Sequence, residues 1–253
     1  MKETRLLMGM GITVEISDSS ATKEIFDEVF SYFKYVDEKF STYKNTSEIS
    51  RVNSGELSEE FWSKDMKEVF ALAEETKKLT DGYFDIIRAD GTYDPSGLVK
   101  GWAIFNAAEI IKRAGFENFY VEAGGDIEAR GKNGDGEDWK VGIRDPFDKE
   151  KKIIVKVISV SDIGIATSGT YVLGQHIYNP HARDRRITEI VSFTVVGPNI
   201  YEADRFATAA FAMGREGIRF IENLPGFEGY MIDKDGIATE TSGFKGYVLN
   251  NNL

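Results

Sequence analysis

The chain has 253 residues, of which 42 are acidic and 31 basic, so its formal net charge is −11. A surface this acidic argues against non-specific binding to nucleic acid or to an anionic membrane. The absence of cysteine excludes disulfides, thiolate catalysis and cysteine-ligated metals, and with two histidines a multi-histidine metal site is not expected. Any metal should therefore be a hard ion bound through oxygen.

No stretch approaches the roughly 20 apolar residues that span a bilayer, so a transmembrane segment is not expected. Residues 1–10 are too short in their apolar part to be a signal peptide. The sequence fits a cytoplasmic chain, or an exported chain whose leader has been removed. Its length suits one large domain or two tightly fused halves.

The first part of the chain is expected to hold one strand and several helices. Residues 3–16 should form the strand, and Ser19 and Ser20 should cap a helix over residues 22–40 whose apolar face packs in the core. A polar loop and a short helix follow. In that loop, Tyr43 is either a surface residue or a ring that stacks on a flat ligand. A further helix is predicted over residues 64–79.

Residues 93–101, Tyr-Asp-Pro-Ser-Gly-Leu-Val-Lys-Gly, are predicted to be a turn that becomes the first turn of a helix. Pro95 ends the preceding segment and Ser96 is a good N-cap. Apolar residues then recur at helical spacing until Gly115. The free N–H groups of a helix start, together with Lys100, would suit a phosphate. An ordinary helix start explains the same pattern.

The second half is predicted to be rich in strands. We expect them over residues 118–123, 127–129, 139–143, 153–160, 163–166 and 190–196, followed by a helix over 201–213 and a hairpin that turns at 233–236. Asp204 and Thr208 are four residues apart and should share one face of that helix. Irregular alternation of helices with consecutive strands favours an α+β fold over a doubly wound parallel sheet.

Several separated motifs are together more specific than any one of them. In chain order they are Met8-Gly9, Ser41-Thr42-Tyr43 with Ser47-Glu48, residues 94–101, Gly124-Gly125-Asp126, residues 166–169 with 176–180, and residues 202–208. Over about residues 6–235 the pattern resembles the ApbE-type FAD:protein FMN transferases, once described as thiamine-biosynthesis lipoproteins. The resemblance implies one domain over residues 1–253 with an ApbE-like, T-fold-like α+β architecture: mixed sheets, packed helices and a flavin site in a central cleft.

The resemblance also implies a magnesium-dependent enzyme. It would cleave the pyrophosphate of FAD, place FMN on a threonine hydroxyl of an acceptor flavoprotein, and release AMP. The implied partners are FAD, as substrate, and an acceptor with a threonine flavinylation motif, such as a redox-complex or reductase subunit. Two alternatives stay open: a FAD pyrophosphatase that yields FMN and AMP, and an inactive FAD-binding or carrier protein.

Site residues follow from the family pattern by position. Mg²⁺ would be held by the carbonyl of Gly97 with Asp204 and Thr208, which leaves about three of roughly six positions for phosphate oxygens and water. The expected base is His176, because a histidine of near-neutral pKa can take the proton of a hydroxyl nucleophile. The catalytic set is completed by Lys100 and by Asp126, an alternative base or an orienting group. The residues expected to bind FAD are Met8, Tyr43, Tyr83, Phe84, Asp85, Asp94, Lys100, Thr167, Ser168, Gly169 and Tyr178.

Three departures from the family pattern carry expectations of their own. Ala207 stands where the family often has Asp, which predicts weaker or water-mediated metal binding. Asn179 replaces the Asp of the usual His-Ile-x-Asp-Pro, which predicts local changes in the flavin pocket. The segment between Asp85 and Asp94 is shorter than usual, which predicts a more open cleft.

Overall fold

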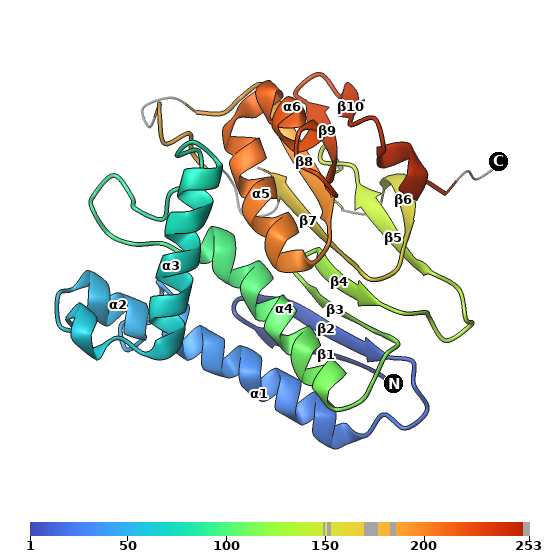
Figure 1. The fold of residues 1–253 in the computed structure, drawn as a ribbon, viewed down its shortest axis with the longest axis horizontal. Helices are drawn as coiled ribbons and strands as arrows, with labels where there is room; N and C mark the ends of the chain where they lie inside the picture. The colour runs from blue at the N-terminus through green and yellow to red at the C-terminus, as the bar shows by residue number, and fades with distance from the viewer. Residues whose placement is uncertain (149, 151–152, 170–176, 183–185, 250–253) are drawn as a thin grey trace.

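The computed structural model describes residues 1–148, 150, 153–169, 177–182 and 186–249. Its centre is an eight-stranded sheet with the order β1-β2-β3-β4-β7-β8-β9-β10, and a separate pair is formed by β5 and β6 (Figure 1). The strands of the large sheet are β1 (Lys2–Leu7), β2 (Met10–Ile16), β3 (Phe119–Ala123), β4 (Asp126–Arg130), β7 (Ile163–Gly169), β8 (Ile190–Gly197), β9 (Glu228–Asp233) and β10 (Ala238–Glu240). The pair consists of β5 (Trp139–Arg144) and β6 (Ile154–Val160).

The helices lie on one side of the large sheet (Figure 1). They are α1 (Lys23–Phe40), α2 (Glu48–Asn53), α3 (Lys64–Leu79), α4 (Ser96–Arg113), α5 (Ile200–Ala212) and α6 (Gly217–Glu222), with short 3₁₀ turns at Glu59–Phe61, Gly214–Glu216 and Phe244–Tyr247. Figure 1 shows α1, α4 and α5 running across the sheet, with α3 beside them. Within the described residues, no helix combines the length and apolarity needed to cross a bilayer.

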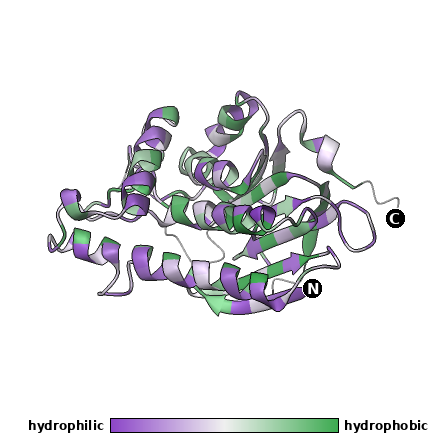
Figure 2. Ribbon diagram, turned by 60° about the horizontal axis from the view of Figure 1, so that its bottom comes forward, coloured by the Kyte–Doolittle hydropathy of each residue, from purple (hydrophilic) through white to green (hydrophobic). Residues whose placement is uncertain are grey.

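Strand alternation divides the core between the two faces of the sheet. Successive residues of a strand point to opposite faces. Val195 of β8 accordingly packs into the core under the helices, and its neighbour Val196 packs with Trp139 of β5 and Ile158 of β6 on the other side. Apolar residues gather where the helices meet the sheet, and polar residues lie on the outward sides of the helices (Figure 2).

Most predicted elements are confirmed with small changes at their ends. The helix predicted over residues 64–79 has those bounds as α3, and the hairpin turning at 233–236 joins β9 to β10. All strand pairs between the named strands are antiparallel, which confirms the α+β prediction.

Three local predictions are wrong. Residues 3–16 form a hairpin rather than one strand, because Met8 (φ 52°) and Gly9 (φ 74°) adopt the positive φ values that a tight two-residue turn requires. The N-cap of α1 is Thr22, not Ser19 or Ser20. Ser96 is the first residue of α4 rather than its cap, because the N-cap is Pro95; the amide of Ser96 donates to Asp94 Oδ1 at 3.1 Å.

Candidate functional site

The β1–β2 turn, the β3–β4 turn and the C-terminal end of β7 lie at the same end of the large sheet. The amide of Gly124, in the turn between β3 and β4, donates to the carbonyl of Gly11 on β2 at 3.4 Å. Asp126, the first residue of β4, accepts a hydrogen bond from the amide of Thr167 on β7 at 2.9 Å. This end of the sheet therefore carries the Gly-Gly-Asp motif beside the hydroxyl-rich end of β7.

A lysine and two buried aspartates occupy the same place. Lys100 Nζ, on α4, lies 2.6 Å from Asp126 Oδ2 and 3.7 Å from Asp204 Oδ1 on α5. The aspartate side chains expose only 1% and 3% of their surface, whereas that of Lys100 exposes 27%. One ammonium thus stands between two carboxylates that are out of water, and it remains accessible to a ligand from the outside.

Burial sets the charge states of this group. Burial raises the pKa of Asp204 to about 7, although Lys100 opposes the shift; the charge of Asp126 adds to it. Burial alone would lower the pKa of Lys100, but the two carboxylates outweigh it and the pKa is raised. Lys100 is therefore a permanent cation at neutral pH.

Glycines bring α4 against α5. The amide of Gly101 donates to Asp204 Oδ2 at 2.7 Å, and a Cβ on Gly101 would lie 2.6 Å from the Cβ of Asp204. One turn earlier, a Cβ on Gly97 would lie 3.2 Å from Thr208 Cγ2. Gly101 was missed by the sequence reasoning, and the signal that could have found it is the four-residue spacing from Gly97, which places both on one helix face.

The predicted metal ligands are brought together. Thr208 Oγ1 lies 3.3 Å from the carbonyl oxygen of Gly97 and 3.5 Å from Ser168 Oγ, and Asp204 lies one turn away on the same face of α5. Among the described residues no cluster of three or more Asp, Glu or His side chains could hold a metal unaided. A carbonyl, a hydroxyl and one carboxylate are hard oxygen donors that fit Mg²⁺ when phosphates and water complete its shell.

Ala207 lies in α5 between Asp204 and Thr208. It is fully buried and belongs to the apolar core between the helices and the sheet.

The Tyr83–Asp85 segment, predicted to bind FAD, forms a second part of the candidate site. Phe84 is buried, and its Cε2 would lie 3.5 Å from a Cβ on Gly97, so its ring supports the first turn of α4. Asp85 pairs with Lys77 Nζ at 3.0 Å, and the hydroxyl of Tyr178 donates to the carbonyl of Ile87 at 2.9 Å. The Lys77–Asp85 pair holds the segment against α3.

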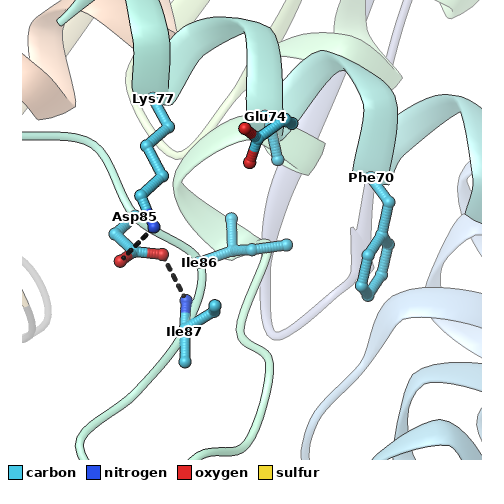
Figure 3. Close-up of a pocket in the computed structure, with 7 residues that line it drawn as sticks. Phe70, Glu74, Lys77, Asp85, Ile86 and Ile87 are labelled. Atoms are coloured by element: carbon cyan, nitrogen blue, oxygen red, sulfur yellow. Dashed lines mark hydrogen bonds and ion pairs between the residues drawn. The ribbon is translucent and has the colours of Figure 1, made fainter. Parts of the chain in front are cut away.

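A shallow hollow opens between this segment and α3 (Figure 3). In Figure 3 the Lys77–Asp85 ion pair closes one side, while Phe70 lies at the other. The residues that line the hollow are Phe70, Ala73, Glu74, Lys77, Asp85, Ile86 and Ile87.

The other predicted FAD-binding residues have the following surroundings. Asp94 pairs with Arg88. Tyr83 packs edge-on against His181, with ring centroids 4.6 Å apart. Met8 lies in the β1–β2 turn, and Tyr43, in the loop between α1 and α2, exposes 94% of its surface. The Tyr43 ring is therefore accessible to a flat ligand.

The remaining predictions concern His176, Asn179 and Gly169. His176 lies outside the described residues. Asn179 is described, and its Oδ1 accepts the amide of His181 at 2.9 Å, a hydrogen bond that an aspartate in its place could also accept. Gly169, the last residue of β7, is buried.

Comparisons with known proteins agree on one family. Residues 8–93 and 88–231 match the ApbE family. The FAD:protein FMN transferase of Escherichia coli K12 is 31% identical over 173 residues, which cover 65% of this chain and 46% of that protein. The chain thus spans about half the length of this curated relative. The Haemophilus influenzae protein of the same name is 24% identical across 96% of this chain and 92% of its own length.

Solved structures give the same result for the fold. The flavin transferase ApbE from Vibrio cholerae superposes with a TM-score of 0.82 at 25% identity, over 98% of each chain. The ApbE protein of Thermotoga maritima, 20% identical, superposes with a TM-score of 0.86 over 98% of each chain. Because the family match covers most of the sequence and the folds superpose end to end, the chain belongs to the ApbE family.

Proposed function

We propose that this protein is a magnesium-dependent FAD:protein FMN transferase. It cleaves the pyrophosphate of FAD, attaches FMN to a threonine of an acceptor flavoprotein and releases AMP. The observation that carries the proposal is the meeting of Lys100, Asp204 and the Gly97–Thr208 pair at one end of the sheet. The names of the relatives in Escherichia coli and Vibrio cholerae support the choice of reaction.

The reaction requires positive groups that neutralise the negative charge of the FAD pyrophosphate. The acceptor hydroxyl oxygen forms a bond to the phosphorus of the FMN half, and the bond from that phosphorus to the bridging oxygen breaks, so the oxygen leaves with AMP. Negative charge grows on the phosphoryl oxygens as this happens. Lys100 is a fixed cation, 27% exposed, and can stabilise that charge without reorganisation.

The metal-binding residues would be Asp204, Thr208 and the carbonyl of Gly97. When bound there, Mg²⁺ would supply positive charge to the pyrophosphate oxygens. Ser168, whose hydroxyl lies 3.5 Å from that of Thr208, would add an outer contact.

Asp126 suits an orienting role better than that of a base. Its Oδ2 pairs with Lys100 at 2.6 Å and its Oδ1 accepts the amide of Thr167 at 2.9 Å, so both oxygens are engaged. The ion pair holds this carboxylate against Lys100, where it fixes the position of the ammonium. The threonine proton is then taken by His176, the role that the family resemblance implies for it.

Incubation with FAD, Mg²⁺ and an acceptor flavoprotein domain tests the proposal by mass spectrometry. We expect a mass gain of one FMN on the acceptor, one AMP per FMN transferred, and no gain when the acceptor threonine is replaced by alanine. An unmodified acceptor would contradict the proposal for that acceptor.

The same assay separates the alternatives. Free FMN and AMP formed without acceptor, at a rate comparable with transfer, would indicate a FAD pyrophosphatase. Stoichiometric FAD binding without AMP release in the presence of Mg²⁺ would indicate a carrier protein.

A further inference from the structure

Arg205 is a buried cation next to the proposed metal ligand Asp204. Its residue exposure is 4%, and a charged side chain is rarely buried this far unless it is fully paired. The guanidinium lies over the rings of Tyr201 and Phe206, with its carbon 4.9 Å and 4.8 Å from their centroids. Its side chain reaches from α5 to α3.

The donors of Arg205 reach both helices. Nε and Nη2 donate to Glu202 Oε2 at 2.9 and 2.6 Å, which fixes the side chain to its own helix. Nη1 donates to Thr76 Oγ1 at 3.1 Å and to Glu75 Oε1 at 3.3 Å, both on α3. It also reaches the hydroxyl of Tyr201 at 3.2 Å. A planar guanidinium can make these contacts together, and a lysine ammonium cannot.

The chain of hydrogen bonds continues along α3. Thr80 Oγ1 donates to the carbonyl of Thr76 at 2.8 Å, and the amide of Phe84 donates to Thr80 Oγ1 at 3.1 Å. Thr76 and Thr80 are 0% and 1% exposed, so water cannot replace these bonds. The path from Arg205 thus ends at Phe84, whose ring lies under Gly97.

We propose that Arg205 is a positioning residue that couples the metal side of the site to its nucleotide side. It holds α5, with Asp204 and Thr208, at a fixed distance from α3. Through Thr76 and Thr80 it also fixes the Phe84 segment. The assignment of one side to the metal and the other to the nucleotide rests on the proposed function. The link from Arg205 through Thr76 and Thr80 to Phe84 does not.

Amide exchange tests the link without any activity. We expect the Phe84 amide to lose protection in two variants, Arg205→Met and Thr76→Val. The second variant keeps the charges and the shape of the side chain but removes the hydroxyl that accepts from Arg205. The amide of Gly229, which donates to Thr241 at 2.8 Å in the C-terminal part of the sheet, should keep its protection in both. Wild-type protection of Phe84 in either folded variant would overturn the proposal.

Kinetics tests the consequence for the site. We expect Arg205→Met to raise both the half-saturating Mg²⁺ concentration and the KM for FAD, each by about 10-fold. This is the lower end of the loss of metal affinity seen when a residue that supports a metal ligand is removed. Thr80→Val should raise the KM for FAD and leave the Mg²⁺ requirement unchanged, because it cuts the path beyond α3. Arg205→Lys should recover only part of the loss, since it cannot span both helices.

Arg219→Met is the matched control, because Arg219 is exposed. Among the described residues it forms an ion pair only with Glu216, three positions earlier in the chain. It should change neither constant. Equal effects of Arg205→Met and Arg219→Met, or an unchanged Mg²⁺ requirement in folded Arg205→Met, would overturn the proposed coupling. If the wild-type protein shows no turnover of FAD, the proposed function fails, and the exchange experiment alone decides the role of Arg205.

Discussion

Gly101 and Asp204 are 103 residues apart in the chain, yet the amide of one donates a 2.7 Å hydrogen bond to the carboxylate of the other. That bond exists because Gly101 has no Cβ: an added one would lie 2.8 Å from the carbonyl of Ile200 as well as 2.6 Å from the Cβ of Asp204. A close approach of α4 to α5 therefore lies at the proposed metal site, so helix packing and the proposed metal binding depend on the same glycine.

Gly101→Ala should consequently damage both stability and activity. Alanine gains about 1 kcal/mol of helix propensity over glycine, but the clash forces α4 and α5 apart, and overpacking costs about 1–3 kcal/mol. We expect a lower Tm, and a Mg²⁺-dependent turnover at least about 10-fold lower because Asp204 is displaced. Gly134→Ala, where a Cβ meets nothing within 4 Å, is the control. A variant with wild-type turnover would show that the α4–α5 contact does not set the site.

Asp204→Asn should abolish Mg²⁺-dependent turnover while preserving some FAD binding through Tyr43 and Lys100. The amide oxygen can still accept from Gly101, so the helix contact survives while the anionic metal ligand is lost. Turnover against Mg²⁺ concentration and FAD binding by flavin fluorescence measure the two effects separately. Asp135→Asn, in an exposed turn, should behave as wild type. Unchanged turnover in Asp204→Asn would remove Asp204 from the mechanism.

Glu128 should make stability depend on pH. Its carboxylate is fully buried in β4, pairs with Arg130, and accepts the amide of Ile200 at the start of α5 at 2.6 Å. Burial raises its pKa to about 7, against the opposing effect of Arg130. Because the folded state binds this proton more tightly than the unfolded chain, the contribution of Glu128 to stability falls as pH rises from its unfolded pKa, about 4.3, to about 7.

Urea unfolding at several pH values checks this. The wild-type free energy of unfolding should decrease across the window, and Glu128→Gln should flatten the profile. Glu117→Gln, at an exposed position, should leave the profile unchanged. A Glu128→Gln profile as steep as that of the wild type would mean that another group carries the dependence.

Tyr178→Phe should weaken FAD binding without changing the chemical step. The Tyr178 hydroxyl donates to the carbonyl of Ile87 at 2.9 Å and so holds the segment that follows Asp85. Loss of one such bond is worth about 1 kcal/mol, which corresponds to a KM for FAD raised roughly five-fold. Steady-state kinetics at saturating Mg²⁺ should show kcat unchanged. Tyr35→Phe removes an exposed hydroxyl that bonds Asp65 and serves as control. A fall in kcat instead would place Tyr178 closer to the reaction than proposed.

The sequence by itself determined most elements, because their signals are local. Hydropathy of helical period defines α3 between Lys64 and Leu79, and alternating strands with turn residues define the β9–β10 hairpin. The order of consecutive strands was enough for the α+β class. The early hairpin was missed because Met8, in a left-handed conformation, gives no turn signal of the Asn-Gly kind.

The tertiary structure alone decided how the site is assembled. Nothing local in the sequence pairs Lys100 with Asp126 or sets Asp204 against Gly101, because such contacts depend on sheet order, strand register and the distance between helices. It also set Asp126, the candidate base or orienting group, against Lys100, and it brought Arg205 of α5 into contact with Thr76 of α3. The sequence motifs indicated which residues could act together, and the packing of helices on the sheet determined which of them are in contact.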